Sequence, residues 1–214
     1  MGLIKQGILG GFSKKTGTVV GAYWRRLDVI RALPRKSGKA PTQSQLEQQQ
    51  KFGLVTAFLS DFSELIDVGF KSTSSATAMN RAVAYHLQEA IIGTSPDYAI
   101  DLAKFKFSEG KVEVPDMVTA NAISGGGIHY VWDGLTDEGK FIQPTDTVTV
   151  VAYNANRQKF VKVIAATTRG IGEFVMQMPQ AYNGDTVHLY ISFTSAVKKL
   201  NSNSLYLGTG VVSF

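Results

Sequence analysis

The sequence contains no cysteine, which excludes disulfide bonds and thiolate-bound metal ions from the structure. Long apolar runs are also missing, because no stretch approaches the roughly 18 uninterrupted apolar residues of a membrane-spanning helix. The first residues, MGLIKQGILGGF, contain a short apolar run that glycines interrupt, unlike the apolar region of a signal peptide. We therefore expect synthesis in the cytoplasm without a classical signal peptide, and no contact with a membrane.

Catalytic motifs are equally scarce. Histidine occurs only at the separated positions His86, His129 and His188, without an HExxH pattern, and no GxSxG motif is present. The glycine triplet at 125–127 lacks the lysine of a phosphate-binding loop and precedes a β-rich run, so it predicts a turn. The acidic loop at 133–138 lacks the DxDxDG spacing of calcium sites. The sequence thus predicts neither an enzyme nor a cofactor or metal site.

The positive charge of the chain is concentrated near its N-terminus. The first 43 residues contain nine Lys or Arg residues and one acid, Asp28, whereas the other 171 residues have a net charge of −3. The formal charge of +5 at pH 7 therefore describes a cationic segment joined to a mildly acidic body. Such a segment is expected to contact a neighbouring subunit, a nucleic acid or the acidic face of its own domain.

The cationic segment, residues 1–41, is predicted to be an extended, glycine-rich N-terminal arm that ends in a basic linker. Two β-rich runs, Thr18–Trp24 and Leu27–Leu33, flank the polar pair Arg25-Arg26, a pattern typical of a hairpin or of two extended segments. Five glycines between positions 7 and 21 weaken any strand that forms alone. We therefore expect the arm to become ordered against a partner.

A helical segment is predicted for residues 42–97. Thr42 and Gln45 have the spacing of a capping box at the start of a helix. A second helix is expected from Ser75 to Ile92, where Gly93 ends it. The first helix has an amphipathic stripe at three- and four-residue steps, which consists of Leu46, Phe52, Val55, Phe58, Leu59, Phe62, Leu65 and Ile66.

Residues 98–214 alternate between short strands and turns. Two of the runs alternate apolar and polar side chains, as expected of strands with one buried face. Strand spacing of about ten residues is typical of a sandwich. We predict an α+β protein with two helices and an antiparallel β-sandwich, immunoglobulin- or fibronectin-like, that forms one compact domain with the helices. Its expected strands are 99–108, 111–114, 117–123, 127–132, 146–153, 159–167, 173–178, 186–194 and 205–213.

The arm also contains the candidate site residues. Its cations alternate with aromatic rings, a mixture that can pair with phosphates and stack on bases. Arginine and aromatic residues are also the usual anchors of protein interfaces, and the paired aliphatic residues indicate strands. We favour a protein partner over a nucleic acid for this interface, which consists of Phe12, Lys14, Lys15, Val19, Val20, Tyr23, Trp24, Arg25, Arg26, Ile30 and Arg31.

Four blocks of the sequence are distinctive. Residues 10–24 follow the pattern GGFSxKxGxVVGxxW, and residues 42–52 follow with TQSQLEQQQKF. Near the other end, residues 181–190 read AYNGDTVHLY and residues 205–210 read LYLGTG. Together these blocks resemble a family of uncharacterised proteins, a domain of unknown function that is common in Bacteroidota genomes. The resemblance implies membership of this family but no activity.

A second, shorter resemblance concerns assembly. The block from Pro41 to Gln45, followed by a helix, is similar to a segment of tailed-phage virion proteins, in which extended arms clasp neighbouring subunits. Our leading hypothesis is a non-enzymatic structural protein of a phage or prophage virion, or of another self-assembling particle. Its partners would be copies of itself or neighbouring subunits. The alternatives are a protein that binds nucleic acid through the arm, and a carbohydrate-binding or carbohydrate-active sandwich protein.

Overall fold

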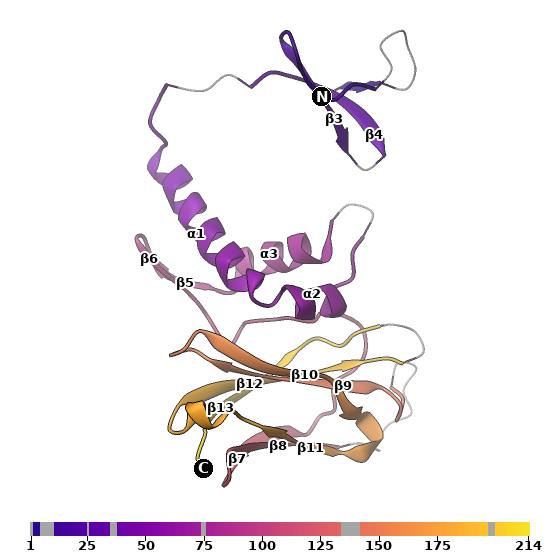
Figure 1. Ribbon diagram of the computed structural model, residues 1–214, viewed down its shortest axis with the longest axis vertical. Helices are drawn as coiled ribbons and strands as arrows, with labels where there is room; N and C mark the ends of the chain where they lie inside the picture. The colour runs from indigo at the N-terminus through magenta and orange to yellow at the C-terminus, as the bar shows by residue number, and fades with distance from the viewer. Residues whose placement is uncertain are drawn as a thin grey trace. The chain divides into compact units, whose positions relative to one another are not determined.

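The computed structural model describes residues 2–4, 11–24, 26–34, 38–73, 76–133, 142–196 and 200–214 (Figure 1). The chain divides into two compact units, Met1–Thr42 and Gln43–Phe214. We call them the N-terminal sheet and the body, and each is described by itself.

The N-terminal sheet has four described antiparallel strands in the order β1-β4-β3-β2. Strands β3 (Val19–Trp24) and β4 (Leu27–Ala32) form the predicted hairpin. Strands β1 (Gly2–Ile4) and β2 (Lys14–Thr16) pair with its two sides. The sequence did not predict these two short strands, which turn an expected extended arm into a sheet.

A glycine lets the chain cross one face of this sheet. A β-carbon at Gly21 would collide with both the backbone and the ring of Phe12, so Phe12 lies directly on the β3 backbone. Gly11 lies equally close to the Asp28 carboxylate of β4. The glycines that weaken isolated strands therefore permit close packing here.

The first predicted helix is divided into two in the body. Helix α1 (Gln43–Ser60) ends before Phe62, and helix α2 (Ser63–Gly69) follows at once. The C-terminal part of the predicted stripe is buried, but Phe52 is 51% exposed and Leu46 is also exposed. The first half of α1 is therefore not part of the core of the body.

The second predicted helix is shorter than expected. Helix α3 (Ala78–Glu89) begins at Thr77, whose side chain accepts a hydrogen bond from the backbone N–H of Asn80. Instead of continuing to Ile92, the chain forms strand β5 (Ile91–Thr94). This strand pairs with β6 (Asp97–Ile100).

Two of the predicted strands are wrong. Of the expected strand 99–108, only the first two residues belong to β6, and the rest form a loop that places Phe105 and Phe107 in the core. The expected strand 111–114 contributes only an isolated bridge between Val112 and Ser202. Their apolar residues are buried as predicted, but in an irregular segment.

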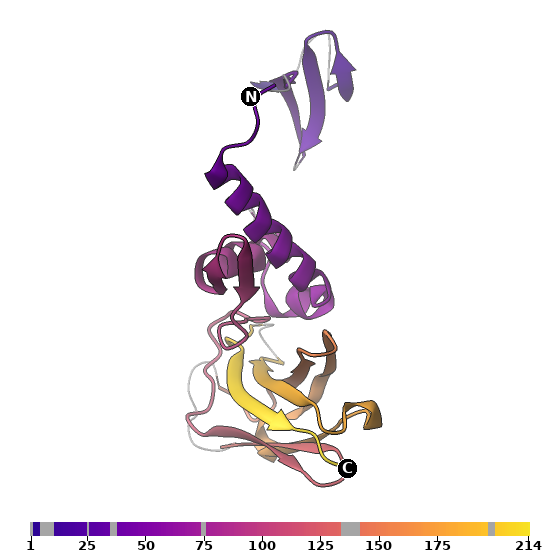
Figure 2. The same ribbon diagram turned by 90° about the vertical axis from the view of Figure 1, so that its left-hand side faces the viewer.

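The other strand predictions for the body are confirmed to within two residues. They are β7 (Val118–Ile123), β8 (Gly127–Trp132), β9 (Thr147–Asn154), β10 (Lys159–Thr168), β11 (Glu173–Gln177), β12 (Thr186–Thr194) and β13 (Leu205–Val211). They form two antiparallel sheets, β11-β8-β7 and β10-β9-β12-β13. Figure 2 shows these two sheets packed face to face. The fold is the α+β sandwich that the sequence predicts.

The larger sheet is buried on both faces. Val148 and Val150 of β9 contribute to the core between the sheets, whereas Val151 and Tyr153 of the same strand contribute to the core beneath the helices. Figure 1 shows this sheet between the helical layer and the sheet β11-β8-β7. Seven of the eight residues of β9 are accordingly buried.

Strand β10 lies at the edge of the larger sheet and contains a bulge. Its pairing with β9 shifts register between Val163 and Thr167. Within this bulge Ala165 has a φ of 51°, in the left-handed region that non-glycine residues seldom adopt.

A buried ion pair closes one end of the sandwich. Arg169 is 2% exposed, Asp146 is 0% exposed, and the Arg169 Nε lies 3.5 Å from the Asp146 Oδ2. The guanidinium donates to the Glu113 carbonyl at 2.6 Å and lies over the Phe193 ring, 4.4 Å from its centroid. The Trp132 indole N–H donates to the Arg169 carbonyl at 2.8 Å. These contacts connect Arg169 to β8, to β12 and to the loop that contains Glu113.

Candidate functional site

The end of the β3–β4 hairpin presents the most exposed aromatic residues of the described N-terminal sheet. Tyr23 is 69% exposed, Trp24 is 55% exposed and Leu27 is 44% exposed. Trp24 pairs directly with Leu27 across the two strands, so these two side chains share one face, whereas Tyr23 lies on the other. We call Tyr23, Trp24, Arg26 and Leu27 the hairpin tip.

Arg26 adopts an unusual backbone conformation at this tip. Its φ is 67°, in the left-handed region, where glycine is the ordinary residue of a two-residue hairpin turn. A side chain in this region costs about 1–2 kcal/mol relative to the right-handed conformation. An arginine held there at the expense of stability is a candidate for a functional contact.

The cations of the N-terminal sheet are divided between its two faces. Lys15 and Arg31 both pair with Val20, so they lie on the Trp24 side of the sheet. Lys14 pairs with Gly21 and therefore lies on the opposite side, with Tyr23. The sheet thus has positive charge on both faces.

The other predicted interface residues have more internal roles. Val19, Val20 and Ile30 are half-buried in the sheet, and Phe12 is half-buried on Gly21. Arg25 lies outside the described residues. Sequence reasoning missed Leu27 as an interface residue, although its position beside the turn and opposite Trp24 could have identified it.

The β2 edge of the N-terminal sheet is a poor site for strand addition. Edge strand β2 is three residues long and contains Lys14 and Lys15. Short edges with lysines are a common protection against pairing with another chain. A partner is therefore better accommodated by the hairpin tip and the sheet faces than by β2.

The three histidines do not form a site. His129 Nε2 lies 3.0 Å from Glu173 Oε2 on the sheet β11-β8-β7, and His188 Nδ1 lies 3.0 Å from the Tyr206 hydroxyl. His86 is a buried residue of α3. In the described part of the chain, no three His, Cys, Asp or Glu side chains come close enough together to hold a metal ion. The glycine triplet lies in the β7–β8 hairpin, where Gly125 and Gly126 have positive φ. Asp137 and Glu138 of the acidic loop lie outside the described residues.

Both ring nitrogens of His86 have partners that suit the neutral ring. Nδ1 donates to the Ala82 carbonyl at 2.7 Å, and the Lys106 backbone N–H donates to Nε2 at 3.2 Å. Burial lowers the pKa of His86, and the Lys106 charge adds to this, while the Ala82 hydrogen bond opposes it. The histidine is therefore a structural group whose protonation opposes folding.

Replacing His86 with glutamine should reduce the loss of stability in mild acid. Because the folded-state pKa of His86 is lowered, its contribution is complete above the unfolded-state pKa near 6.5 and declines as the pH falls. Between pH 6.5 and 5.5, wild-type protein should lose up to about 1 kcal/mol more unfolding free energy than His86→Gln. Urea unfolding at both pH values measures this difference. Equal losses in the two proteins would contradict the prediction. Burial also lowers the pKa of His188, but this residue is present in both proteins and does not affect the difference between them.

Comparisons with known proteins give a family but no activity. No curated protein matches this chain. Among solved structures, the FN1-FN3 domains of chicken CNTN1 match with 15% sequence identity and a TM-score of 0.36. That match covers 55% of this chain and 37% of the CNTN1 chain, so this chain spans little more than a third of that one. No helix among the described residues is long and apolar enough to span a membrane. The family model of DUF6266, a family of unknown function, matches residues 11–208, and the chain therefore belongs to the DUF6266 family.

Proposed function

We propose that this protein is a non-enzymatic structural subunit that self-assembles through its N-terminal sheet, as a component of a phage or prophage virion or of a similar particle. The observation that carries this proposal is the hairpin tip, where Tyr23 and Trp24 are mostly exposed beside Arg26. Aromatic and arginine side chains are the commonest anchors of protein interfaces. The occupant of this surface is the body of a second copy.

Charge complementarity supports a second copy as the partner. Residues 1–42 contain nine basic residues and one acid, whereas the rest of the chain is net acidic. Opposite net charges steer the two surfaces together and fix their orientation more than they raise affinity. The similarity of residues 41–45 to virion proteins also implies self-assembly of this kind. The resemblance of the N-terminal motif implies that such a phage or prophage has a Bacteroidota host.

The distribution of cations favours a protein partner over a nucleic acid. A nucleic-acid groove needs its cations along one continuous track beside the phosphates. Here Lys15 and Arg31 lie on one face of the sheet and Lys14 lies on the other. A carbohydrate site on the sandwich is less favoured still, because every described Tyr and Trp of the body is buried or half-buried.

Substitution of the hairpin tip should weaken self-association. The full chain should associate with increasing concentration, and Tyr23→Ser/Trp24→Ser should weaken the association constant at least about tenfold, as expected for interface anchors. Sedimentation equilibrium measures the constants, and electron microscopy shows whether particles form. A wild-type chain that stays monomeric over the concentrations tested would contradict the proposal.

Arg26→Gly provides a variant whose loss of assembly cannot result from misfolding. Glycine relieves the left-handed backbone strain, so the unfolding temperature should stay equal or rise. Self-association should nevertheless fall, because the side chain that contacts the partner is gone. The matched control is Gln158→Gly, which changes an exposed residue of the body with a φ of 53° and should leave association unchanged. Unchanged association of Arg26→Gly would contradict the proposal. Bound nucleic acid that raises the 260/280 nm absorbance ratio, and that is lost in Lys15→Gln/Arg31→Gln, would favour the nucleic-acid alternative.

A further inference from the structure

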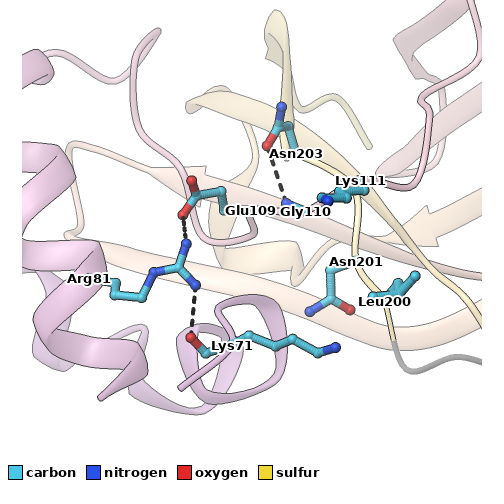
Figure 3. A pocket seen from close by; sticks show the side chains of 8 residues that line it. All are labelled: Lys71, Arg81, Glu109, Gly110, Lys111, Leu200, Asn201 and Asn203. Atoms are coloured by element: carbon cyan, nitrogen blue, oxygen red, sulfur yellow. Dashed lines mark hydrogen bonds and ion pairs between the residues drawn. The ribbon is translucent and has the colours of Figure 1, made fainter. Parts of the chain in front are cut away.

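A cavity of about 630 Å³ lies in the body, where the helical layer meets the loops of the sandwich. Its walls come from four separate segments: the loop after α2, helix α3, the loop after β6, and the connection between β12 and β13 (Figure 3). A β-carbon at Gly110 would collide with the Asn201 backbone carbonyl, so this glycine lets two of the segments approach closely. The volume lies within the range of about 300–1,000 Å³ that small-molecule sites occupy.

The side chains that line this cavity carry a net positive charge. It is lined by the cations Lys71, Arg81 and Lys111 and by one acid, Glu109. Glu109 is already paired with Arg81, whose Nη2 lies 2.7 Å from the Glu109 Oε2. Among the described residues neither Lys71 nor Lys111 forms an ion pair. Two positive charges therefore remain without a counter-charge in the cavity wall.

Part of the cavity wall is held in place before any ligand arrives. Arg81 is fixed at both ends of its guanidinium, because Nη1 donates to the Lys71 carbonyl at 2.8 Å while Nη2 contacts Glu109. The buried Asn201 side chain donates to the Val68 and Gly69 carbonyls, which anchors the opposite wall to α2. Figure 3 shows the two lysines extending from different segments of the wall. The cavity therefore has a hydrogen-bonded frame and two exposed cations that can reach a ligand.

From this geometry we propose that the cavity binds a small anionic ligand that carries phosphate or carboxylate groups with at least two negative charges. Lys71 and Lys111 supply the charges that pair with its oxygen atoms, because an ammonium group donates to an oxyanion as a compact point charge. Arg81 adds a positive potential from the wall. All the residues that line this site belong to the body, and none belongs to the hairpin tip.

Isothermal titration calorimetry of the full chain with inorganic phosphate and with citrate, at matched ionic strength, tests this proposal. At least one of the two anions should bind wild-type protein with a dissociation constant below about 1 mM, which corresponds to about 4 kcal/mol of binding free energy. Lys71→Gln/Lys111→Gln should weaken that binding at least tenfold, and Lys71→Arg/Lys111→Arg should retain it. Binding of phosphate alone identifies a phosphorylated ligand, and binding of citrate alone identifies a polycarboxylate.

The matched control is Lys104→Gln/Lys159→Gln, which removes the same charge from two exposed lysines that do not line the cavity. It should leave anion affinity unchanged. Equal binding by wild-type protein and Lys71→Gln/Lys111→Gln, equal weakening in the control, or no binding of either anion would overturn the proposal. Because Lys71 and Lys111 are both exposed, their replacement should not change the unfolding temperature. Sedimentation of the same variant should show unchanged self-association, so that a failure of anion binding and a failure of self-assembly can be told apart.

Discussion

Replacing Arg169 with alanine should lower the unfolding free energy by about 3–5 kcal/mol, the cost of removing one partner from a buried ion pair. The change leaves the Asp146 carboxyl group fully buried without its ion-pair partner, and its Oδ1 has no hydrogen-bond partner even with Arg169 present. It also removes the hydrogen bond to the Glu113 carbonyl and the contact with the Phe193 ring. Several independent contacts are therefore lost together.

Urea unfolding monitored by tryptophan fluorescence measures this loss, because Trp132 donates a hydrogen bond to the Arg169 carbonyl and reports on the same region. The matched control is Arg157→Ala, which breaks the more exposed ion pair with Asp185 and should cost less than about 1 kcal/mol. The double change Asp146→Leu/Arg169→Met should recover much of the stability, since it removes both buried charges. A loss below about 1 kcal/mol for Arg169→Ala would show that water reaches this ion pair.

Phe105→Ala should destabilise the body by about 3–5 kcal/mol, as expected when a buried phenyl ring is removed and its space is not refilled. The ring is buried at the centre of the core beneath the helices. It contacts Phe62 of the helical layer at 4.7 Å between centroids and Tyr190 of β12 at 5.3 Å. Its removal therefore weakens the contact between the helical layer and the sandwich.

The exposed Phe52 of α1 provides the matched control. Phe52→Ala removes the same side chain from the surface and should change the unfolding free energy by less than about 1 kcal/mol. Calorimetry of both variants shows whether the body still unfolds in a single transition. If Phe105→Ala were no more destabilising than Phe52→Ala, the helices would not depend on the sandwich for their packing.

The sequence predicted the regular parts of the fold well because their signals are local. Strand β12 alternates apolar and polar residues, and the structure places Val187, Leu189 and Ile191 in the core between the sheets. The β3–β4 hairpin was recognisable because a polar pair separates two β-rich runs. The alternation of apolar and polar residues gave a wrong strand prediction where buried residues belong to a loop. Phe105 and Phe107 alternate as in a strand, yet they reach the core from a loop.

The candidate sites were less predictable, because they depend on contacts between distant parts of the chain. Arg169 and Asp146 carry no local signal of their pairing, which arises only when the ends of β9 and β10 meet. The cations Lys71 and Lys111 belong to segments that no spacing rule connects. Tyr23 and Trp24 were predicted as interface residues from type and order alone, whereas the left-handed conformation of Arg26 required the structure.

The bulge at Ala165 bears on how one edge of the larger sheet meets other chains. Strand β10 is ten residues long and forms one edge of the larger sheet, so an unbroken β10 would offer a template for unlimited lateral growth into aggregates. The register shift interrupts this ladder of backbone groups, and the exposed Lys159 adds a charge at the start of the same strand. We therefore expect the β10 edge to resist pairing with the same edge of another copy, and so to resist fibril growth at high protein concentration.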